Sequence, residues 1–490
     1  MITSLHSNTG RNHGSRDAAK TGIMCGGSRT TAQIHAGGPK AIFDFVIIGA
    51  GAAGEAAAFL SLARGASVAI VERDLVGGSC PFFACMPSKT LLHGAAVHAL
   101  GGHYPWAQAS ARRDWMIDRE GVPYPDDTGH VHRLEEVGAT VVRGRARLDG
   151  PGRVIVARQD GGEQVVEARE VVVAVGSVSR WPQLEGLEAV EPWTNREATS
   201  TRELPRSLLV LGGGPTGVEM AQVFARYGVP VTIVESNQRI LTRDHPRNSA
   251  AVTAGLARDG VIVLTGRRAL RARAGAGGDG AHVVDLDDGS SVAGHRVMLS
   301  VGRTFPLADI GLESVGIDPA SIVPDGRLRL RAGLWLIGDP AGPELHTHVS
   351  HYQGELAVRM ALGDPVTPDY RAIPRCTYTD PEVAFVGLSL DGALAAGQDA
   401  VEFVADVGTS AKGYVSEADG HVTIVVDRAA RVLLGAAIAG PGAGEAIHAA
   451  VLAVKTRVPI DVLADTIHAF PTTARVLGLL YIDAARALAS

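Results

Sequence analysis

Two cysteines five positions apart are the residues in this sequence whose spacing most clearly suggests chemistry. Cys80 and Cys85 lie in the stretch GGSCPFFACMPSK, and the 490-residue chain has four cysteines in total. A zinc site needs three or four ligands, whereas this pair supplies two. Three other interpretations are a structural disulfide, a pair of unrelated buried thiols and a redox-active couple.

The local sequence favours the redox-active couple. Two residues five apart on a regular helix have Cα atoms about 8.6 Å apart, and a disulfide bridges at most ~7 Å. Both cysteines therefore cannot lie in an ideal helix. Pro81 is typical of a first helical turn, so we expect Cys80 at the helix cap and Cys85 one turn inside. A helix N-terminus lowers the pKa of a thiol, which makes the thiol reactive.

A glycine pattern that occurs twice indicates where electrons would come from. Each copy has an apolar run, a Gly-x-Gly-x-x-Gly loop, a helical stretch and a second apolar run that ends in glutamate. The glutamate follows the first loop glycine by 23 positions in both copies, at 49 to 72 and at 212 to 235. The residues concerned are Gly49, Gly51, Gly54 and Glu72 in the first copy and Gly212, Gly214, Gly217 and Glu235 in the second.

Each part of this pattern has a physical role in dinucleotide binding. The first glycine makes a tight turn, the second lets a pyrophosphate approach the backbone, and the third lets the helix pack on the strand. The helix N-terminus faces the phosphates, and the acid binds a ribose hydroxyl. Two such sites predict a flavin and a nicotinamide nucleotide. A carboxylate at Glu235 favours NADH over NADPH, a preference that the nearby Arg239 would soften.

The sequence around the two cysteines resembles the redox motif of the flavin-dependent pyridine nucleotide–disulfide oxidoreductases. This family includes dihydrolipoamide dehydrogenase, glutathione reductase and mercuric reductase. Further motifs agree in order and spacing from about residue 43 to the C-terminus. They are GGGPTGVEMA, VVVAVGS at 171–177, LWLIGDPAG at 334–342, YTDPEVAFVG at 378–387, GPGAGEAIHAAVLAV at 440–454 and TIHAFPTT at 466–473.

The resemblance implies a role for each matching residue. Cys85 would be the thiol that meets the flavin ring, and Cys80 would be the interchange thiol that faces the acceptor. Lys89 and Glu219 would pair beside the reactive edge of the ring, and Asp339 would bind the ribityl chain. The implied cofactor-binding positions are Gly49, Gly51, Gly54, Glu72, Lys89, Gly176, Gly338, Asp339, Gly212, Gly214, Gly217, Glu235 and Gly302. No resident metal is implied.

The C-terminal motif departs from the family pattern. Disulfide-reducing members carry His-Pro-Thr there, with a glutamate five residues after the histidine, and this pair manages the thiol proton in the partner subunit's site. Here the two positions hold Phe470 and Arg475. General acid–base help is worth about 10²–10⁴-fold in rate, so efficient thiol–disulfide exchange is disfavoured. His468 would face the other way in an extended segment, which indicates a structural role.

Two more departures concern other members of the family. Mercuric reductases typically add a C-terminal cysteine pair, whereas no cysteine follows Cys376 in this sequence. Pro215 stands where some relatives carry a tyrosine that gates the nicotinamide pocket.

The predicted fold class is α/β, with two doubly wound, Rossmann-like dinucleotide-binding domains and a C-terminal α+β dimerisation domain. The NAD domain is inserted in the FAD domain. The predicted parts are a disordered tail at 1–40, the FAD-binding domain at 41–195 and 322–365, the NAD(P)-binding domain at 196–321 and the dimerisation domain at 366–490. The sequence predicts no function for the segment 101–135.

Composition narrows the class of protein. Hydrophobic residues make up 46% and charged residues 20% of the chain, which is typical of a globular protein. A net charge of −6 argues against a nucleic-acid binder. The sequence contains no apolar run of the length of a membrane span and no apolar signal-peptide region in its first forty residues. We therefore predict a cytoplasmic protein.

Three functions follow from these observations. The first is a homodimeric FAD enzyme that oxidises NADH and passes electrons through Cys80–Cys85 to a small acceptor, such as a quinone, a dye, a metal ion or a disulfide. The second is dihydrolipoamide dehydrogenase with an unrecognised base. The third is a non-catalytic redox sensor.

Overall fold

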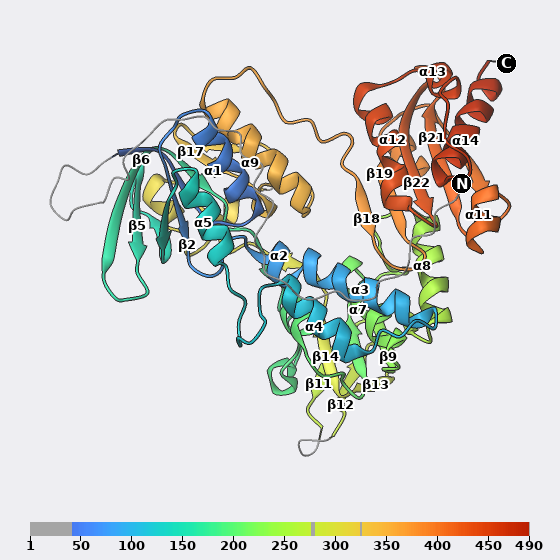
Figure 1. The fold of residues 1–490 in the computed structure, drawn as a ribbon, viewed down its shortest axis with the longest axis horizontal. Coiled ribbons are helices and arrows are strands. Elements are labelled where there is room, and N and C mark those ends of the chain that lie inside the picture. The colour runs from blue at the N-terminus through green and yellow to red at the C-terminus, as the bar shows by residue number, and fades with distance from the viewer. Residues whose placement is uncertain (1–41, 276–279, 324–325, 490) are drawn as a thin grey trace, which may run out of the picture. The chain divides into compact units, whose positions relative to one another are not determined.

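The computed structural model of the protein describes residues 42–275, 280–323 and 326–489 (Figure 1). The tail predicted for residues 1–40 lies outside the described residues, as does Cys25. Helices and strands alternate through most of the described chain, and the α/β class is confirmed.

A mixed sheet of eight strands contains β1, the strand that leads into the first glycine loop. Its parallel part has the order β17-β6-β1-β2-β3, and β16, β5 and β4 extend it by antiparallel pairing. The last four residues of β1 are buried, as expected for a central parallel strand. The strands are β1 (Ile42–Ile48), β2 (Val68–Glu72), β3 (Thr140–Arg143), β4 (Arg145–Leu148), β5 (Arg153–Ala157), β6 (Glu163–Val173), β16 (Arg329–Arg331) and β17 (Leu334–Leu336).

Helices from distant parts of the chain accompany this sheet. Gly354 of α9 lies so close to α1 that a Cβ there would be 2.4 Å from the Ala53 carbonyl oxygen. The two helices therefore pack backbone against backbone (Figure 1). The helices beside this sheet are α1 (Ala52–Ala63), α5 (Thr128–Glu136) and α9 (Thr347–Ala361). Helices α2 (Ser79–Phe83), α3 (Cys85–Ala99) and α4 (Trp106–Met116) come between α1 and α5 in the chain, and α3 and α4 share a core with the second sheet.

A second sheet, which is wholly parallel, contains β8, the strand that leads into the second glycine loop. Its four strands have the order β10-β9-β8-β14, and every residue of β8 is buried. The elements are α6 (Asn195–Ser200), β8 (Leu208–Leu211), α7 (Pro215–Arg226), β9 (Val231–Glu235), α8 (Pro246–Arg258), β10 (Ile262–Thr265) and β14 (Arg296–Leu299), with smaller antiparallel pairings of β11 (Ala269–Arg273), β12 (His282–Leu286) and β13 (Ser291–Gly294), and of β7 (Val178–Ser179) with β15 (Arg303–Thr304).

The second sheet is inserted between strands of the first. Strand β6 ends at Val173 and pairs with β17, which begins at Leu334, while all of β8 to β14 lies between them in the chain. This order agrees with the predicted insertion of one nucleotide domain in the other. The boundaries at 195, 321 and 365 stay predictions.

The C-terminal part is an antiparallel sheet with helices packed on it. Its strand order is β18-β19-β22-β21-β20, and the core lies between this sheet and helices α12 and α14. The elements are β18 (Arg375–Thr377), β19 (Val383–Gly387), α10 (Leu390–Ala395), β20 (Ala400–Asp406), α11 (Ala411–Ser416), β21 (His421–Asp427), β22 (Val432–Ala439), α12 (Ala443–Thr456), α13 (Ile460–Ala464) and α14 (Thr473–Ala487).

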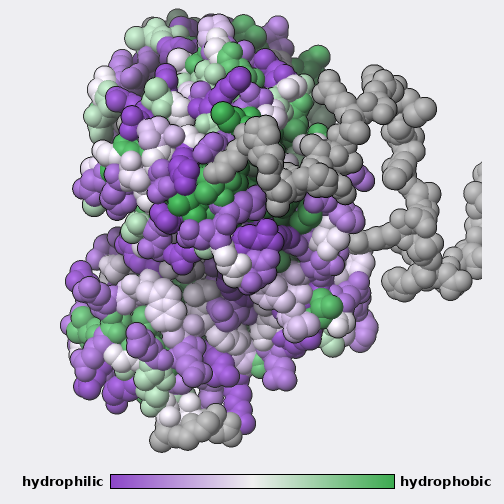
Figure 2. Space-filling model, turned by 90° about the vertical axis from the view of Figure 1, so that its left-hand side faces the viewer, coloured by the Kyte–Doolittle hydropathy of each residue, from purple (hydrophilic) through white to green (hydrophobic). Residues whose placement is uncertain are grey.

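The surface agrees with the absence of a membrane span from the sequence. Hydrophilic residues cover most of the face shown in Figure 2, and hydrophobic residues form small patches there. None of the helices in the described ranges has the length and apolar character needed to cross a bilayer.

The two glycine loops share one backbone geometry. The first glycine has a positive φ in each, +104° at Gly49 and +101° at Gly212, so it makes the tight turn that other residues rarely adopt. A Cβ on the third glycine would lie 2.0 Å from the Gly49 oxygen at Gly54 and 2.3 Å from the Gly212 oxygen at Gly217. The protein's own packing therefore requires glycine at both positions.

This packing predicts different effects for two alanine substitutions in one loop. Gly54→Ala forces a methyl group against the Gly49 carbonyl and should destabilise the protein by about 1–3 kcal/mol. Gly51→Ala should leave the free energy of unfolding nearly unchanged, because a Cβ there meets its nearest atom at 3.9 Å. Urea unfolding of the flavin-free variants measures both, and equal destabilisation would contradict the packing argument.

Candidate active site

A helix break places the two cysteines beside each other. Cys80 is the second residue of α2, and Cys85 is the first residue of α3. Ala84 between them has φ −132° and ψ −99°, which is not helical. The single helix expected from the sequence is therefore wrong in this detail. The break matters because a regular helix would hold residues five apart too far from each other to join.

The two thiols are joined by a hydrogen bond, and Thr347 interacts with both. Both are free, they are hydrogen-bonded to each other, and Cys85 Sγ lies 3.4 Å from Thr347 Oγ1 at the start of α9. The hydrogen bond from Cys80 lowers the pKa of Cys85 to about 6, with further help from Thr347 and from the charge of Lys89. The pKa of Cys80 is raised, because its hydrogen bond to Cys85 and its burial favour the neutral thiol. Cys85 is therefore the thiolate.

A buried ion pair lies next to this thiolate. Lys89 Nζ is 2.8 Å from Glu219 Oε2 and 3.1 Å from Oε1, and Glu219 is 3% exposed. Glu219 also accepts a hydrogen bond of 3.0 Å from the Tyr378 amide. Lys89 lies four residues after Cys85 on α3, so both side chains share one face of that helix. The pair gives the thiolate a cation whose position is fixed.

The structure brings nearly all predicted site residues to one cavity of ≈ 1690 Å³. Gly54 and Gly217 are the exceptions, because they lie where each helix packs on its strand. The predicted residues that line the cavity are Gly49, Gly51, Glu72, Cys80, Cys85, Lys89, Gly176, Gly212, Gly214, Glu219, Glu235, Gly302, Gly338 and Asp339.

The second glycine of each loop tests whether the cavity fits a dinucleotide. Gly51 and Gly214 have ordinary φ values of −80° and −74°. A Cβ on either would meet no protein atom closer than 3.9 Å. Neither backbone strain nor protein packing explains glycine there, whereas the close approach of a pyrophosphate does. The residues therefore fit FAD at the first loop and a nicotinamide nucleotide at the second.

The two strand-end glutamates stabilise the loops in the same way. Glu72 accepts backbone N–H bonds of 2.7 Å from Ala50 and from Asp74, and burial raises its pKa. Glu235 accepts bonds of 2.7 Å from the Gly213 and Asn237 amides. Each carboxylate thus fixes the loop before a ligand arrives.

Several residues at the site escaped sequence reasoning. Asp339 contacts Ser177, and Arg303 contacts both, with Arg303 Nε 3.7 Å from the Asp339 carboxylate. Ser177 follows the predicted Gly176, and Arg303 follows the predicted Gly302. Their positions next to predicted site residues are the sequence feature that could have identified them. Thr347 lies 262 positions from Cys85 and carried no such signal.

Two histidines also line this cavity beside Thr347. The rings of His346 and His348 stack with centroids 5.0 Å apart, and burial lowers the pKa of His346 to about 4. Both imidazoles are therefore neutral near pH 7, since the pKa of His348 is lowered as well.

The C-terminal motif provides no base. Phe470 is 74% exposed. His468 Nδ1 lies 3.0 Å from the Thr466 carbonyl oxygen and packs against Gly478 and Tyr481 of α14. Its position agrees with the structural role expected from the sequence.

Comparison with known families decides the membership. Residues 43–354 match the pyridine nucleotide-disulphide oxidoreductase model, and residues 373–480 match the dimerisation domain of the same family. The chain belongs to the pyridine nucleotide-disulphide oxidoreductases. This membership confirms the predicted enzyme class and fold: the protein is a flavin-dependent oxidoreductase that uses a pyridine nucleotide.

Similar proteins within the family differ in their named activities. A dihydrolipoyl dehydrogenase from Rhizobium etli is 30% identical over 90% of this chain and 98% of its own length. A mercuric reductase from Streptomyces lividans is 32% identical over 91% of this chain and 96% of its own length. Among solved structures, LpdA from Mycobacterium tuberculosis has a TM-score of 0.80 at 27% identity, over 90% of this chain and 99% of that one. The flavoprotein disulfide reductase RclA from Escherichia coli shares the fold. Its TM-score is 0.80 at 24% identity, over 90% of this chain and 99% of that one.

The geometry of the cysteine pair predicts the pH dependence of its alkylation. Cys85 should react with iodoacetamide with a midpoint near its pKa of about 6, and Cys376 should stay unreactive because burial raises its pKa to about 11. Lys89→Gln should move the Cys85 midpoint to higher pH, since the lysine charge favours the thiolate. Peptide mass mapping of the reduced enzyme measures each site.

Lys455→Gln is the matched control. Its ammonium group pairs with Asp369 instead. An equal shift in both variants would contradict a local effect of Lys89.

Proposed function

We propose that this protein oxidises NADH and passes the electrons through Cys80 and Cys85 to a small acceptor that needs no positioned base. Quinones, redox dyes and metal ions are acceptors of this kind. The observation that carries the proposal is the C-terminal motif, where Phe470 and Arg475 occupy the positions of the family's acid–base pair. Neither side chain can exchange the proton that a leaving thiol requires.

The cofactor roles are part of the proposal. Gly49, Gly51, Glu72 and Asp339 hold FAD, and Lys89 with Glu219 borders its ring. Gly176 and Gly338 lie along the same cavity. FAD bound there would supply two-electron chemistry between the nicotinamide and the Cys80–Cys85 disulfide. Two electrons and one proton, both of which a hydride provides, convert that disulfide into the thiol of Cys80 and the thiolate of Cys85.

NADH is the proposed donor, bound at Gly212, Gly214, Glu235 and Gly302. The Glu235 carboxylate at the strand end repels a 2′-phosphate. Arg239 does not offset this repulsion, because its guanidinium donates 2.7 Å hydrogen bonds to the Leu241 and Thr242 carbonyls and a 3.0 Å bond to that of Asp244. The geometry therefore supports NADH over NADPH.

Proton handling at the sulfurs rests on this chain's own groups. The Cys85 thiolate needs no base, since its pKa of about 6 keeps it ionised near pH 7. The Thr347 hydroxyl contacts this thiolate and positions it. Re-forming the Cys80–Cys85 disulfide releases two electrons and the one proton of the Cys80 thiol, and a quinone acceptor takes its second proton from water.

A homodimer is the proposed assembly. The dimerisation domain match supports it. Large apolar side chains are exposed on the C-terminal part and would be covered by a second copy. They are Leu452, Val462, Ile467, Phe470 and Leu479. The cytoplasmic location stays a prediction.

Dihydrolipoamide dehydrogenase is the second candidate. Relatives with that name support it, and His346 lies next to Thr347, which contacts Cys85. The low pKa of His346 makes it a weak base, so this candidate is disfavoured.

The acceptor is identified by steady-state turnover of NADH with lipoamide, glutathione disulfide, a naphthoquinone and Hg²⁺. We expect fast quinone reduction and slow disulfide reduction. Cys85→Ser should abolish the part of the turnover that passes through the sulfurs. Lipoamide turnover as fast as quinone turnover would overturn the proposal. Absence of turnover with every acceptor, despite bound flavin, would favour the redox sensor.

Restoring the missing acid–base pair tests the reason for this preference. Phe470→His with Arg475→Glu should raise lipoamide turnover by up to about 10²-fold, without raising quinone turnover. Ile467→His with Arg475→Glu is the matched control, because it adds the same groups with the histidine at a neighbouring exposed position. An equal gain in both double variants would contradict the positional argument.

A further inference from the structure

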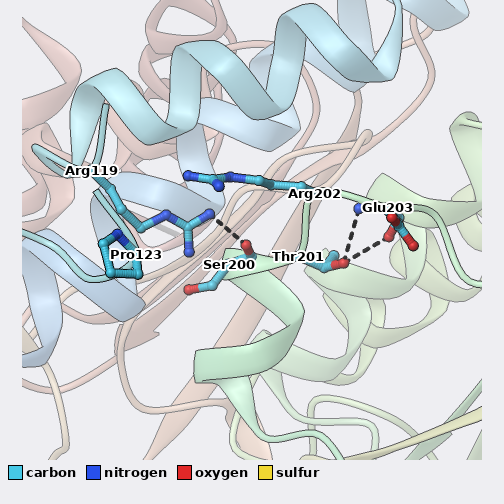
Figure 3. Close-up of a pocket in the computed structure, with 6 residues that line it drawn as sticks. All are labelled: Arg119, Pro123, Ser200, Thr201, Arg202 and Glu203. Atoms are coloured by element: carbon cyan, nitrogen blue, oxygen red, sulfur yellow. Dashed lines mark hydrogen bonds between the residues drawn. The ribbon is translucent and has the colours of Figure 1, made fainter. Parts of the chain in front are cut away.

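A second cavity lies between the segment 101–135, to which the sequence assigned no role, and residues 200–203. Its volume is ≈ 310 Å³, and it is lined by Arg119, Pro123, Ser200, Thr201, Arg202 and Glu203 (Figure 3). None of these residues lines the large cofactor cavity. Helix α6 separates the two, because Thr199 faces the large cavity and Ser200 the small one.

The buried carboxylate of Asp114 pairs with three arginines, of which Arg119 and Arg202 line the cavity and Arg113 lies behind it. Asp114 Oδ1 lies 2.8 Å from Arg113 Nε and 2.7 Å from Arg119, and Oδ2 lies 2.8 Å from Arg202 Nε. Burial, together with the charges of Arg119 and Arg202, lowers the pKa of Arg113 to about 10. Glu203 is the second carboxylate at the cavity and is exposed. These five side chains therefore carry a net charge of +1.

Two donors that point into this cluster have no protein partner. Among the described residues, Arg119 Nε and Ser200 Oγ are buried and form no hydrogen bond. The Arg119 side chain is 9% exposed. Figure 3 shows the Arg119 and Arg202 side chains converging above Ser200. Buried polar groups are hydrogen-bonded as a rule, so this pair is built for an acceptor that the protein itself does not supply.

We propose that this cavity binds a phosphoryl group. A surplus of positive charge selects an anion, and guanidinium groups match the oxygens of phosphates. The donors belong to Arg119, Arg202 and Ser200, which come from two separate segments of the chain. A phosphoryl group has three terminal oxygens and can accept hydrogen bonds from several such donors at once. The volume is at the lower end of the roughly 300–1,000 Å³ of small-ligand sites.

Helix α6 links this site to the redox cysteines. On its cavity side, Arg119 donates to the Ser200 carbonyl at 2.8 Å, and Arg113 donates to those of Thr199 and Thr201. On the other side, Asn195 Nδ2 and Thr199 Oγ1 donate to the Phe83 carbonyl at 2.8 and 3.3 Å. Phe83 lies between Cys80 and Cys85. A bound phosphoryl group would fix the arginines and thereby stabilise the contact of α6 with the segment 80–85, which carries both cysteines.

Calorimetric titration of the flavin-containing protein, without nicotinamide nucleotide, tests the site. The probes are inorganic phosphate and glucose 6-phosphate, with glucose as the uncharged control. Binding of phosphate itself indicates a free-phosphate site, and binding of glucose 6-phosphate alone indicates a phosphorylated metabolite; both support the proposal. Binding of glucose to the same extent, or no binding of either phosphate at millimolar concentration, would overturn it.

Three variants separate the site from general charge effects. Arg202→Gln should weaken binding at least tenfold, and it is preferred to Arg119→Gln because Arg202 is 55% exposed and caps no helix carbonyl. Arg112→Gln removes the same charge from α4 at a position that stacks on Trp115, and it should change nothing. Glu203→Gln should tighten binding several-fold. Equal losses in Arg202→Gln and Arg112→Gln would overturn the proposal.

Hydrogen exchange tests the link through α6. Phosphate should slow amide exchange in residues 195–200 of the wild type and of Arg112→Gln, but not of Arg202→Gln. Binding that leaves this exchange unchanged would overturn the link.

Discussion

The hydrogen bond between the two cysteine sulfurs is the interaction on which the site depends. It exists because the chain leaves helical geometry at Ala84, so that α2 ends and α3 begins between the cysteines. The bond makes Cys85 the thiolate and Cys80 the thiol. Lys89, one turn further along α3, and Thr347, from α9, also favour the Cys85 thiolate, and the cavity for the cofactors opens beside it.

The ion pair of Lys89 with Glu219 shows how distant segments are joined at this point. A carboxylate that is 3% exposed would be costly without partners, because burial removes its hydration. Lys89 and the Tyr378 amide supply those partners from α3 and from the start of the C-terminal part. The buried Glu219 carboxylate on α7 therefore connects α3 and the start of the C-terminal part beside the reactive cysteines.

The identity of the electron acceptor is a separate question from how the flavin and the cysteines are reduced. Family membership establishes a flavin and a pyridine nucleotide, and the reductive steps need nothing more than the loops and the sulfur pair. The relatives named for lipoyl and for mercury chemistry are about equally similar to this chain, at 30% and 32% identity. Their different names leave the acceptor of the electrons open, and Phe470 and Arg475 at the C-terminal motif are the basis of the proposal for it.

The sequence by itself determined the nucleotide loops, the order of the sheets and the candidate cysteines. These features are local: Gly49 and Gly212 need a positive φ, Gly54 and Gly217 need space against their own loop, and each is read from spacing along a single segment. Tertiary structure alone decided the helix break at Ala84, the contact of Thr347 with Cys85 and the arginine cluster around Asp114. These depend on long-range packing, because the residues meet only after strands and helices far apart in the chain have assembled, and no local pattern records which segments will touch.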